Sequence, residues 1–180
     1  LTNDISILDS NLMLIGRQVP TSFGKFIDLL AIDREGNLVV IELKKDKTPR
    51  EVIAQLLDYG SWIRGLGEND ITGIYEGFQS RYCSHLEDTS FDTAFRNKFR
   101  VDNLPESLNE SHELVVVAAR LDDSTERIIN YLTDFGVAIN AAFFMFFMDK
   151  GNEYLTRAWL IEPIQAEAKI DLKRAKLPWN

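Results

Sequence analysis

Residues 26–44, FIDLLAIDREGNLVVIELK, give the strongest structural signal in this chain of 180 residues. Two apolar runs, at 26–32 and 38–43, flank the turn-forming segment 33–37. Runs rich in Ile, Val and Leu on both sides of a short polar turn are typical of antiparallel strands joined as a hairpin. The stretch therefore predicts two paired strands.

A helix is expected directly after the hairpin. Thr48 can cap this helix, Pro49 suits its first position, and Glu51 can complete a capping box. Gly65 marks its end, near residue 66. Before the hairpin, the short apolar run at 12–15 predicts an edge strand.

The rest of the chain alternates between helical and extended patterns. Asp123 and Glu126 form a capping pattern that begins a helix. Strands interspersed with helices in this order predict an α/β fold with a mixed sheet. Helices are expected at 71–78, 92–99 and 123–135, and strands at 114–119, 137–148 and 154–161.

The composition is that of an ordinary globular protein, with 45% hydrophobic and 27% charged residues. The longest apolar stretch, 137–148, is interrupted by Asn140 and is too short to span a bilayer, so no membrane association is expected. Cys83 is the single cysteine and cannot form an internal disulfide, which favours a cytoplasmic location. The chain begins at Leu1 rather than Met, and we expect it to be part of a longer protein.

Three charged residues lie on the predicted hairpin strands. Asp28 lies in the first strand, and Glu42 and Lys44 close the second. Side chains alternate along a strand, so Glu42 and Lys44 share one face. Antiparallel pairing can also bring Asp28 close to Glu42, and two such carboxylates repel unless they share a proton or a cation. Mg²⁺ (or Mn²⁺) would resolve this conflict because it takes oxygen ligands, and the lysine could orient a metal-bound water or neutralise a phosphate.

Two polar residues of the following helix have the spacing needed to join this site. Gln55 and Tyr59 are four residues apart and therefore lie on the same helix face. The alternative is structural, because the three charged residues could form only an ion-pair cluster at a strand end. A second Glu-x-Lys sequence at 167–169, without strand context, shows that the motif also arises by chance. The combination of all five residues in the order strand, hairpin, strand and helix favours a metal site.

Three segments carry a resemblance to the PD-(D/E)XK nuclease superfamily, and most closely to its NucS-like endonuclease domain: 26–31, 36–44 and 48–59. The resemblance is dense over residues 12–64. It implies a restriction-endonuclease-like core, in which helices flank a mixed β-sheet, over residues 1–165. Residues 68–112 would be a variable helical insertion, and 166–180 a charged helical tail or a linker to a further domain.

The resemblance also implies roles for individual residues. Asp28 and Glu42 match the metal-binding acids of the superfamily, and the Leu43 backbone carbonyl would complete the protein ligands of one or two Mg²⁺ ions. Lys44 matches the catalytic lysine, which would position the attacking water or stabilise the charge of the transition state.

The same resemblance extends to the helix and to the activity. Gln55 and Tyr59 match the QxxxY element shared with RecB-type nucleases, and would position the water, the lysine or the DNA backbone. The implied activity is a metal-dependent endonuclease that hydrolyses DNA phosphodiester bonds in repair, recombination or defence. Related domains add an acid from a helix before the first strand, where this chain offers only Asp4 and Asp9. The alternative function is a catalytically inactive nuclease-fold module that binds nucleic acid or protein.

Basic residues directly after the site could hold phosphates. They are Lys45, Lys47 and Arg50, although such runs are usually solvated surface. The chain as a whole is acidic, with 20 Lys and Arg against 28 Asp and Glu, but residues 17–64 contain eight basic and seven acidic residues. The acidity therefore belongs mainly to the scaffold, and it predicts weak, salt-sensitive DNA binding by this domain.

Two aromatic segments allow a binding and a structural interpretation. Arg96, Lys98 and Arg100 alternate with aromatic residues, as in surfaces that combine base stacking with phosphate contacts. An amphipathic helix with its phenylalanines in the core fits that segment better. The phenylalanine-rich run at 143–147 is expected in the core, with the alternative that one face contacts a second copy in a homodimer.

Overall fold

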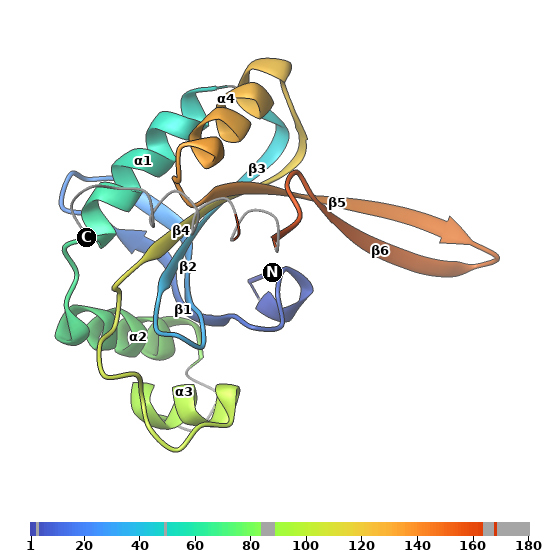
Figure 1. Ribbon diagram of the computed structural model, residues 1–180. Helices are drawn as coiled ribbons and strands as arrows, with labels where there is room; N and C mark the ends of the chain where they lie inside the picture. Colours follow the sequence, from blue (N-terminus) through green and yellow to red (C-terminus); the bar gives the residue numbers. More distant parts are fainter. Residues whose placement is uncertain (3, 49, 84–88, 164–167, 169–180) are drawn as a thin grey trace. The chain divides into compact units, whose positions relative to one another are not determined.

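A mixed β-sheet of six strands, in the order β1-β2-β3-β4-β5-β6, is accompanied by four α-helices in the described part of the chain (Figure 1). The computed structural model describes residues 1–2, 4–48, 50–83, 89–163 and 168, with the backbone alone at 46–48. The predicted α/β class with a mixed sheet is confirmed. The strands are Met13–Pro20 (β1), Phe26–Ile32 (β2), Leu38–Thr48 (β3), His112–Leu121 (β4), Ile139–Asp149 (β5) and Asn152–Trp159 (β6). The helices are Glu51–Ile63 (α1), Glu68–Tyr82 (α2), Phe91–Phe99 (α3) and Asp123–Asp134 (α4), after a 3-10 turn at Ile5–Ile7.

The chain is organised as two compact units, and both β3 and α1 contribute residues to each. The first unit comprises Leu1–Ile41 and Tyr59–His112, and the second comprises Glu42–Asp58 and Glu113–Asn180. The residues predicted for the site therefore divide between the units. The first contains Asp28 and Tyr59, and the second contains Glu42, Lys44 and Gln55.

The predicted hairpin forms the core of the first unit. In the antiparallel β2–β3 ladder, Leu29 lies opposite Ile41 and Ile32 lies opposite Leu38. All four side chains are buried, and burying such a side chain contributes about 1.5–3 kcal/mol. The turn between the strands contains Gly36 at φ +87°, a backbone conformation that glycine adopts without steric cost. The apolar pattern of residues 26–43 thus determines this part of the fold.

Strand β1 is longer than the expected edge strand at 12–15, because it continues to Pro20 along β2. A β-bulge shifts its register between Leu14 and Gly16. Helix α2 packs against β1, and it extends well beyond the expected 71–78. The amphipathic interpretation of α3 is confirmed, because Phe95 and Phe99 are buried.

In the second unit, β4 and β5 are parallel and α4 connects them. The N-cap of α4 is Asp122, whose Oδ1 accepts a hydrogen bond from the Thr125 backbone N–H at 2.6 Å. The prediction of Asp123 as the capping residue was wrong by one position, because the extended backbone that a cap requires falls at Asp122. Gly136, at φ +85°, follows the helix end, where glycine adopts the left-handed conformation without steric cost.

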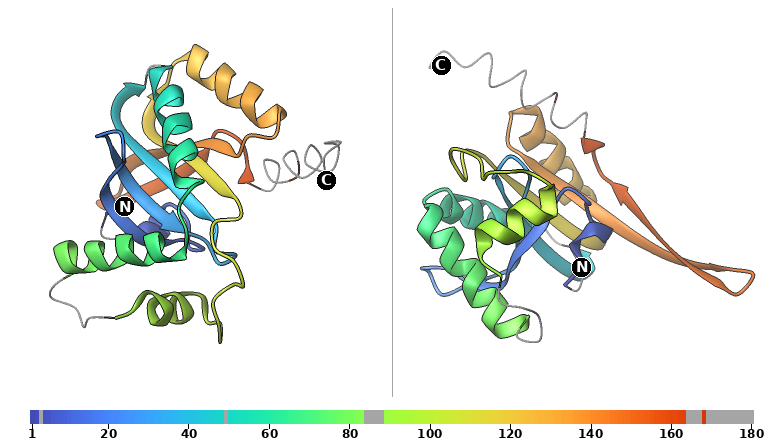
Figure 2. Two further views of the ribbon diagram at one scale, coloured as in Figure 1. Left: turned by 90° about the vertical axis from the view of Figure 1, so that its left-hand side faces the viewer. Right: turned by 90° about the horizontal axis from the view of Figure 1, so that it is seen from below.

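Strands β5 and β6 form a long antiparallel ribbon closed by a two-residue turn. Lys150 and Gly151 both have positive φ, at +49° and +83°, as the tight hairpin turn of type I′ requires. Residues 139–142 are buried beside β4, but the distal part of β5 is exposed. The expectation that the run 143–147 lies in the core was therefore wrong for its second half: the ribbon runs past α4, as Figure 2 shows.

The start of α1 also differs from the expectation. Thr48 is the last residue of β3, and α1 begins at Glu51, so Thr48 is not the helix cap. The charged tail at 166–180 and the second Glu-x-Lys sequence fall outside the described residues, apart from position 168. None of the helices in the described ranges combines the length and the apolar composition that a bilayer span requires.

Candidate active site

Glu42, Lys44 and Gln55 form a closed set of hydrogen bonds in the second unit. Lys44 Nζ lies 2.7 Å from Glu42 Oε1 and 3.2 Å from Gln55 Oε1. Gln55 Nε2 donates to the same Glu42 oxygen at 2.8 Å. Each of the three side chains therefore contacts the other two, and we refer to them as the β3–α1 cluster.

Strand alternation and the position of α1 explain how the cluster forms. Glu42 and Lys44 are two residues apart on β3 and face the same side, as predicted. Gln55 lies in the second turn of α1. Glu42 is only 3% exposed, whereas the Lys44 side chain is 31% exposed. A carboxylate removed from water is costly unless it is paired and hydrogen-bonded, and Lys44 and Gln55 supply both interactions.

A glutamine suits its place in this cluster for a chemical reason. Its amide carries both a donor and an acceptor. A carboxylate at position 55 would repel Glu42, and an ammonium there would repel Lys44. The amide instead donates to Glu42 and accepts from Lys44, and so holds both side chains in place. The cluster can therefore present a compact positive charge at a defined position, where it could stabilise negative charge on a ligand.

In the first unit, Asp28 accepts a hydrogen bond from Gln18. Gln18 Nε2 lies 2.7 Å from Asp28 Oδ1. The two residues lie opposite one another in the β1–β2 ladder, in which Arg17 pairs with Leu29. Gln18 has φ +50°, in the left-handed region that residues other than glycine rarely adopt. Strained backbone of this kind occurs preferentially at functional sites, which marks Gln18 as part of the candidate site.

Gln18 is a candidate that the sequence analysis missed. The expected edge strand stopped at Ile15, so residues 16–20 were not paired with β2. A longer predicted strand would have placed residues 16–20 beside β2, but it would not have identified Gln18 as the residue opposite Asp28. Without the bulge between Leu14 and Gly16, the register would place Arg17 opposite Asp28. The bulge brings Gln18 there instead.

Tyr59 is anchored to the strand that carries Asp28. Its hydroxyl donates to the backbone carbonyl of Phe26 at 2.7 Å. The ring is 1% exposed, and it stacks against Phe23 with 6.2 Å between ring centroids. Phe26 precedes Asp28 by two residues on β2. Tyr59 therefore supports the backbone of the strand that bears this predicted metal ligand.

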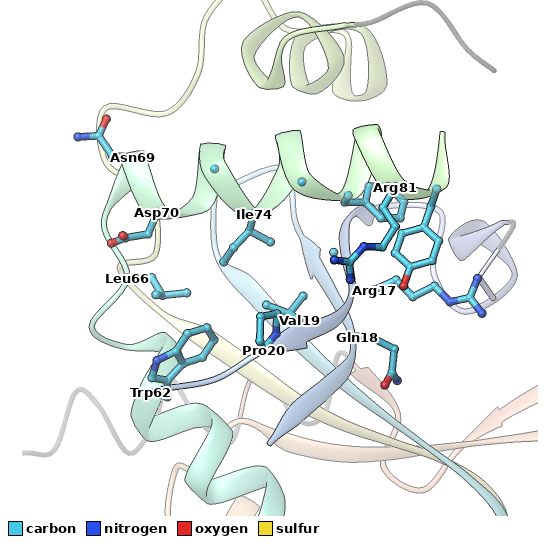
Figure 3. Close-up of a pocket in the computed structure, with 15 residues that line it drawn as sticks. Arg17, Gln18, Val19, Pro20, Trp62, Leu66, Asn69, Asp70, Ile74 and Arg81 are labelled. Carbon is cyan, nitrogen blue, oxygen red and sulfur yellow. The ribbon is translucent and has the colours of Figure 1, made fainter. Parts of the chain in front are cut away.

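A cavity of about 500 Å³ lies between β1 and α2 in the first unit (Figure 3). Trp62 lies at one end of it, and Arg17 and Arg81 lie at the other, as Figure 3 shows. Gln18 also lines the cavity. Because Gln18 contacts Asp28 as well, the cavity and the carboxylate share one residue.

The other residues predicted near the cluster belong to the second unit. Leu43, the proposed carbonyl ligand, is half-buried on β3, and Lys45 is exposed. Arg50 is exposed, with its Nε 3.6 Å from Glu51. The side chain of Lys47 lies outside the part that the structure describes.

The second predicted group of basic residues belongs to the first unit. Arg96 forms an ion pair with Asp92 at 2.8 Å along α3. Lys98 is half-buried, and Arg100 is the exposed C-cap of α3 at φ +55°. Arg96 is thus partly neutralised, and Arg100 presents its charge at the helix end.

The acids available before β1 have local roles. Asp4 caps the 3-10 turn, with its Oδ1 accepting from the Ser6 backbone N–H at 2.9 Å and from the Ser6 hydroxyl at 2.6 Å. These hydrogen bonds lower the pKa of Asp4. Asp9 accepts from the backbone N–H of Asn11 at 2.8 Å. Each acid therefore stabilises a turn close to it in sequence.

The donor set can be tested against the metal that the sequence implies. Among the described residues, no group of three or more His, Cys, Asp or Glu side chains gathers as metal ligands. The proposed donors, Asp28, Glu42 and the Leu43 carbonyl, are two carboxylates and one carbonyl. Mg²⁺ prefers such oxygen donors, and it commonly binds through one or two carboxylates together with water and substrate phosphates. These donors fit Mg²⁺ or Mn²⁺ by chemical type.

Comparison with known proteins finds similarity to endonucleases, although no family model matches the chain. Over 69 residues the chain is 33% identical to endonuclease NucS of Sulfolobus acidocaldarius, and over 69 residues it is 30% identical to endonuclease NucS of Pyrococcus furiosus. Each match covers 38% of this chain, but only 27% and 26% of the respective relatives. The matched segment thus spans about a quarter of the relatives' length. These similarities confirm the resemblance to the NucS-like endonuclease domain.

Two solved structures are also similar. One is a repair endonuclease from Pyrococcus abyssi, with a TM-score of 0.43 and 16% identity over 72% of this chain and 38% of that one. The other is an EndoMS–dsDNA2 complex, with a TM-score of 0.46 and 14% identity over 78% of this chain and 40% of that one.

Proposed function

We propose that this chain is the catalytic part of a metal-dependent endonuclease that hydrolyses phosphodiester bonds in DNA during repair, recombination or defence. The observation that carries the proposal is the β3–α1 cluster, in which a buried carboxylate, an ammonium and an amide are held together. The similarity to endonuclease NucS supports the same class of reaction.

In this proposal, Asp28, Glu42 and the Leu43 carbonyl hold Mg²⁺ or Mn²⁺. Asp28 lies on β2 in the first unit, and Glu42 lies on β3 in the second. Their joint role as ligands comes from the resemblance to the NucS-like endonuclease domain. When bound, the metal polarises the scissile phosphate and lowers the pKa of the attacking water.

The remaining residues act through positioned charge. Lys44 presents an ammonium that Glu42 and Gln55 already hold, so it can stabilise charge on the phosphate with little reorganisation. Gln18 is a positioning residue, because its hydrogen bond to Oδ1 orients the Asp28 carboxylate. Tyr59 supports the same strand through its hydrogen bond to the Phe26 carbonyl, and in this proposal it acts by positioning that strand.

Contacts to the DNA backbone would come from basic residues outside the cluster. Lys45, Lys47 and Arg50 follow the cluster along the chain, and in this proposal they hold phosphates. A second group at α3 would add to this binding: Arg96, Lys98 and Arg100. Such contacts release counterions, so the affinity should fall steeply as salt is raised.

The proposal is tested by nicking of a supercoiled plasmid in the presence of Mg²⁺ or Mn²⁺. We expect the purified chain to relax the plasmid, and we expect Asp28→Asn, Glu42→Gln and Lys44→Ala each to lower the rate by roughly a hundredfold or more. Asp123→Asn and Arg127→Ala, at exposed positions of α4, remove matched charges and should leave the rate unchanged. Circular dichroism checks that every variant is folded.

Calorimetry separates the enzyme from the inactive module. If the chain is an enzyme, the wild type should bind Mn²⁺ and the Glu42→Gln variant should not. DNA binding without Mn²⁺ binding or cleavage would instead identify a catalytically inactive nuclease-fold module. Plasmid cleavage that survives both Asp28→Asn and Lys44→Ala would contradict the site assignment.

A further inference from the structure

The β5–β6 ribbon exposes apolar side chains that two strands cannot bury alone. Met145, Phe146 and Met148 of β5 are 56%, 62% and 67% exposed, and Leu155 of β6 is 53% exposed. Figure 1 shows this distal part of the ribbon extending beyond α4 and β4. A two-stranded ribbon is marginally stable in water, and an exposed apolar edge strand is a template for pairing with another strand. The ribbon therefore has the properties of an interaction surface.

The outer edge of β6 carries backbone groups in a defined pattern. In the described part of the chain, β6 is the last strand of the sheet and pairs only with β5. The backbone N–H of Leu160 donates to the Ala141 carbonyl at 2.8 Å, and the register then continues unshifted to the turn. Even-numbered residues of β6 thus direct their N–H and C=O groups toward β5. Glu153, Leu155 and Arg157 direct theirs toward the outer edge.

The side chains on this edge are complementary to those of a second copy. If two β6 strands pair antiparallel around a two-fold axis at Leu155, each Glu153 lies opposite the partner's Arg157, and the two leucines lie opposite each other. These three residues alternate along the strand and share one face, so all the cross-strand pairs form on the same side. Opposite charges directly across an antiparallel pair attract, and like charges repel.

We propose that this chain forms a homodimer by antiparallel pairing of β6 with β6 of a second copy, centred on Leu155. The proposal goes beyond the nuclease function and does not depend on it. The pairing joins two ribbons into a four-stranded sheet through a self-complementary, two-fold interface. It also completes the exposed backbone edge of each β6 strand with hydrogen bonds.

The neighbouring side chains fit this arrangement. Phe146 lies opposite Leu155 within the ribbon, so pairing creates a continuous row of four apolar side chains across the dimer. The Arg157 guanidinium lies 5.5 Å from the centroid of the Trp159 ring. This contact keeps the guanidinium on the face of β6 that also carries Glu153 and Leu155. The other face of the ribbon is stabilised internally, by stacking of Phe147 on Tyr154 at 5.2 Å.

Charge reversal across the two-fold axis tests the register. The mass of the whole chain is measured by sedimentation equilibrium over a concentration series. We expect the unmodified chain to dimerise, and we expect Glu153→Lys and Arg157→Glu each to raise the dimer dissociation constant by roughly tenfold or more. Arg127→Glu, an equal reversal on exposed α4, should leave the constant unchanged.

Mixing the two weakened variants gives a second readout that does not depend on how well either one dimerises alone. In the mixed dimer, the new lysine meets the new glutamate and the native arginine meets the native glutamate, so dimers should form again. A chain that stays monomeric throughout the series would overturn the proposal. So would dimers that neither reversal weakens, or weakened variants that fail to recover on mixing. Plasmid nicking plays no part in these measurements, so this outcome is separate from that of the nuclease proposal.

Discussion

Gln18 donates a hydrogen bond of 2.7 Å to Asp28 from a backbone with φ +50°. A left-handed residue inside a β-strand costs free energy, and such residues persist where the surrounding structure holds them. The β-bulge before Gly16 provides that context, because it sets the register that places Gln18 opposite Asp28. The relationship links a strained position on β1 to the carboxylate that we propose as a metal ligand.

The first prediction concerns this hydrogen bond. Gln18→Asn keeps an amide and tolerates the left-handed backbone better than glutamine, so the melting temperature should be unchanged or slightly higher. The shorter side chain no longer reaches Asp28, and the plasmid nicking rate should fall about tenfold. Gln18→Glu gives a second readout: the hydrogen bond is replaced by repulsion between two carboxylates, so the nicking rate should fall further than in Gln18→Asn. Wild-type rates in both variants would contradict a positioning role.

The second prediction is a strong energetic coupling between Glu42 and Lys44. Lys44→Met removes the ammonium that lies 2.7 Å from the buried carboxylate and should lower the free energy of unfolding by about 1–3 kcal/mol. The double variant Glu42→Gln with Lys44→Met should lose less than the sum of the single losses, because no buried charge remains. Urea denaturation of all four proteins measures the coupling.

An exposed ion pair on α3 provides a matched control for this comparison of single and double variants. Arg96 and Asp92 form an ion pair at 2.8 Å, but both side chains are exposed. Their coupling should be only about 0.3–0.5 kcal/mol, because water screens the pair. Equal couplings at the two sites would contradict the importance of burial for the β3–α1 cluster.

The third prediction is a pH-dependent stability at Asp33. Burial raises the pKa of this carboxyl, although hydrogen bonds from Asn37 oppose the shift. The folded state therefore favours the protonated acid, and the stability that this group contributes is lost as pH rises from below 3.8 through the folded-state pKa. Asp33→Asn replaces the titrating carboxyl with a neutral amide. As pH rises through this range, the stability of the variant should therefore increase relative to that of the wild type. Parallel pH curves for the two proteins would contradict the assignment.

The fourth prediction separates two adjacent aspartates at the start of α4. Asp122→Ala removes the hydrogen bond to the Thr125 N–H and should lower the free energy of unfolding by about 1 kcal/mol. Asp123→Ala removes only a charge in the first turn and should cost roughly half as much or less. Thermal denaturation distinguishes the two variants. A larger loss of stability in Asp123→Ala than in Asp122→Ala would identify Asp123 as the cap instead.

Much of the fold follows from local patterns in the sequence. The hairpin at 26–43 was predictable because its apolar side chains are continuous and its turn contains an asparagine and a glycine. The amphipathic spacing of Phe95 and Phe99 likewise predicted their burial. The prediction that the run at 143–147 lies in the core was wrong for its second half, because an apolar composition does not reveal whether a neighbouring element covers the strand. Phe146 is 62% exposed, since the ribbon continues past the elements that could bury it.

In the candidate site, too, some features follow from the sequence alone and others depend on the tertiary structure. The sequence by itself determined that Glu42 and Lys44 share a face, because side chains alternate along a strand, and it placed Gln55 on the following helix. Only the tertiary structure decided that Gln55 bridges the other two, because that depends on how α1 packs. Only the tertiary structure also decided that Gln18, rather than Arg17, faces Asp28. A one-residue bulge reverses which side chains point to each face of a strand, and no local pattern in β1 reveals it.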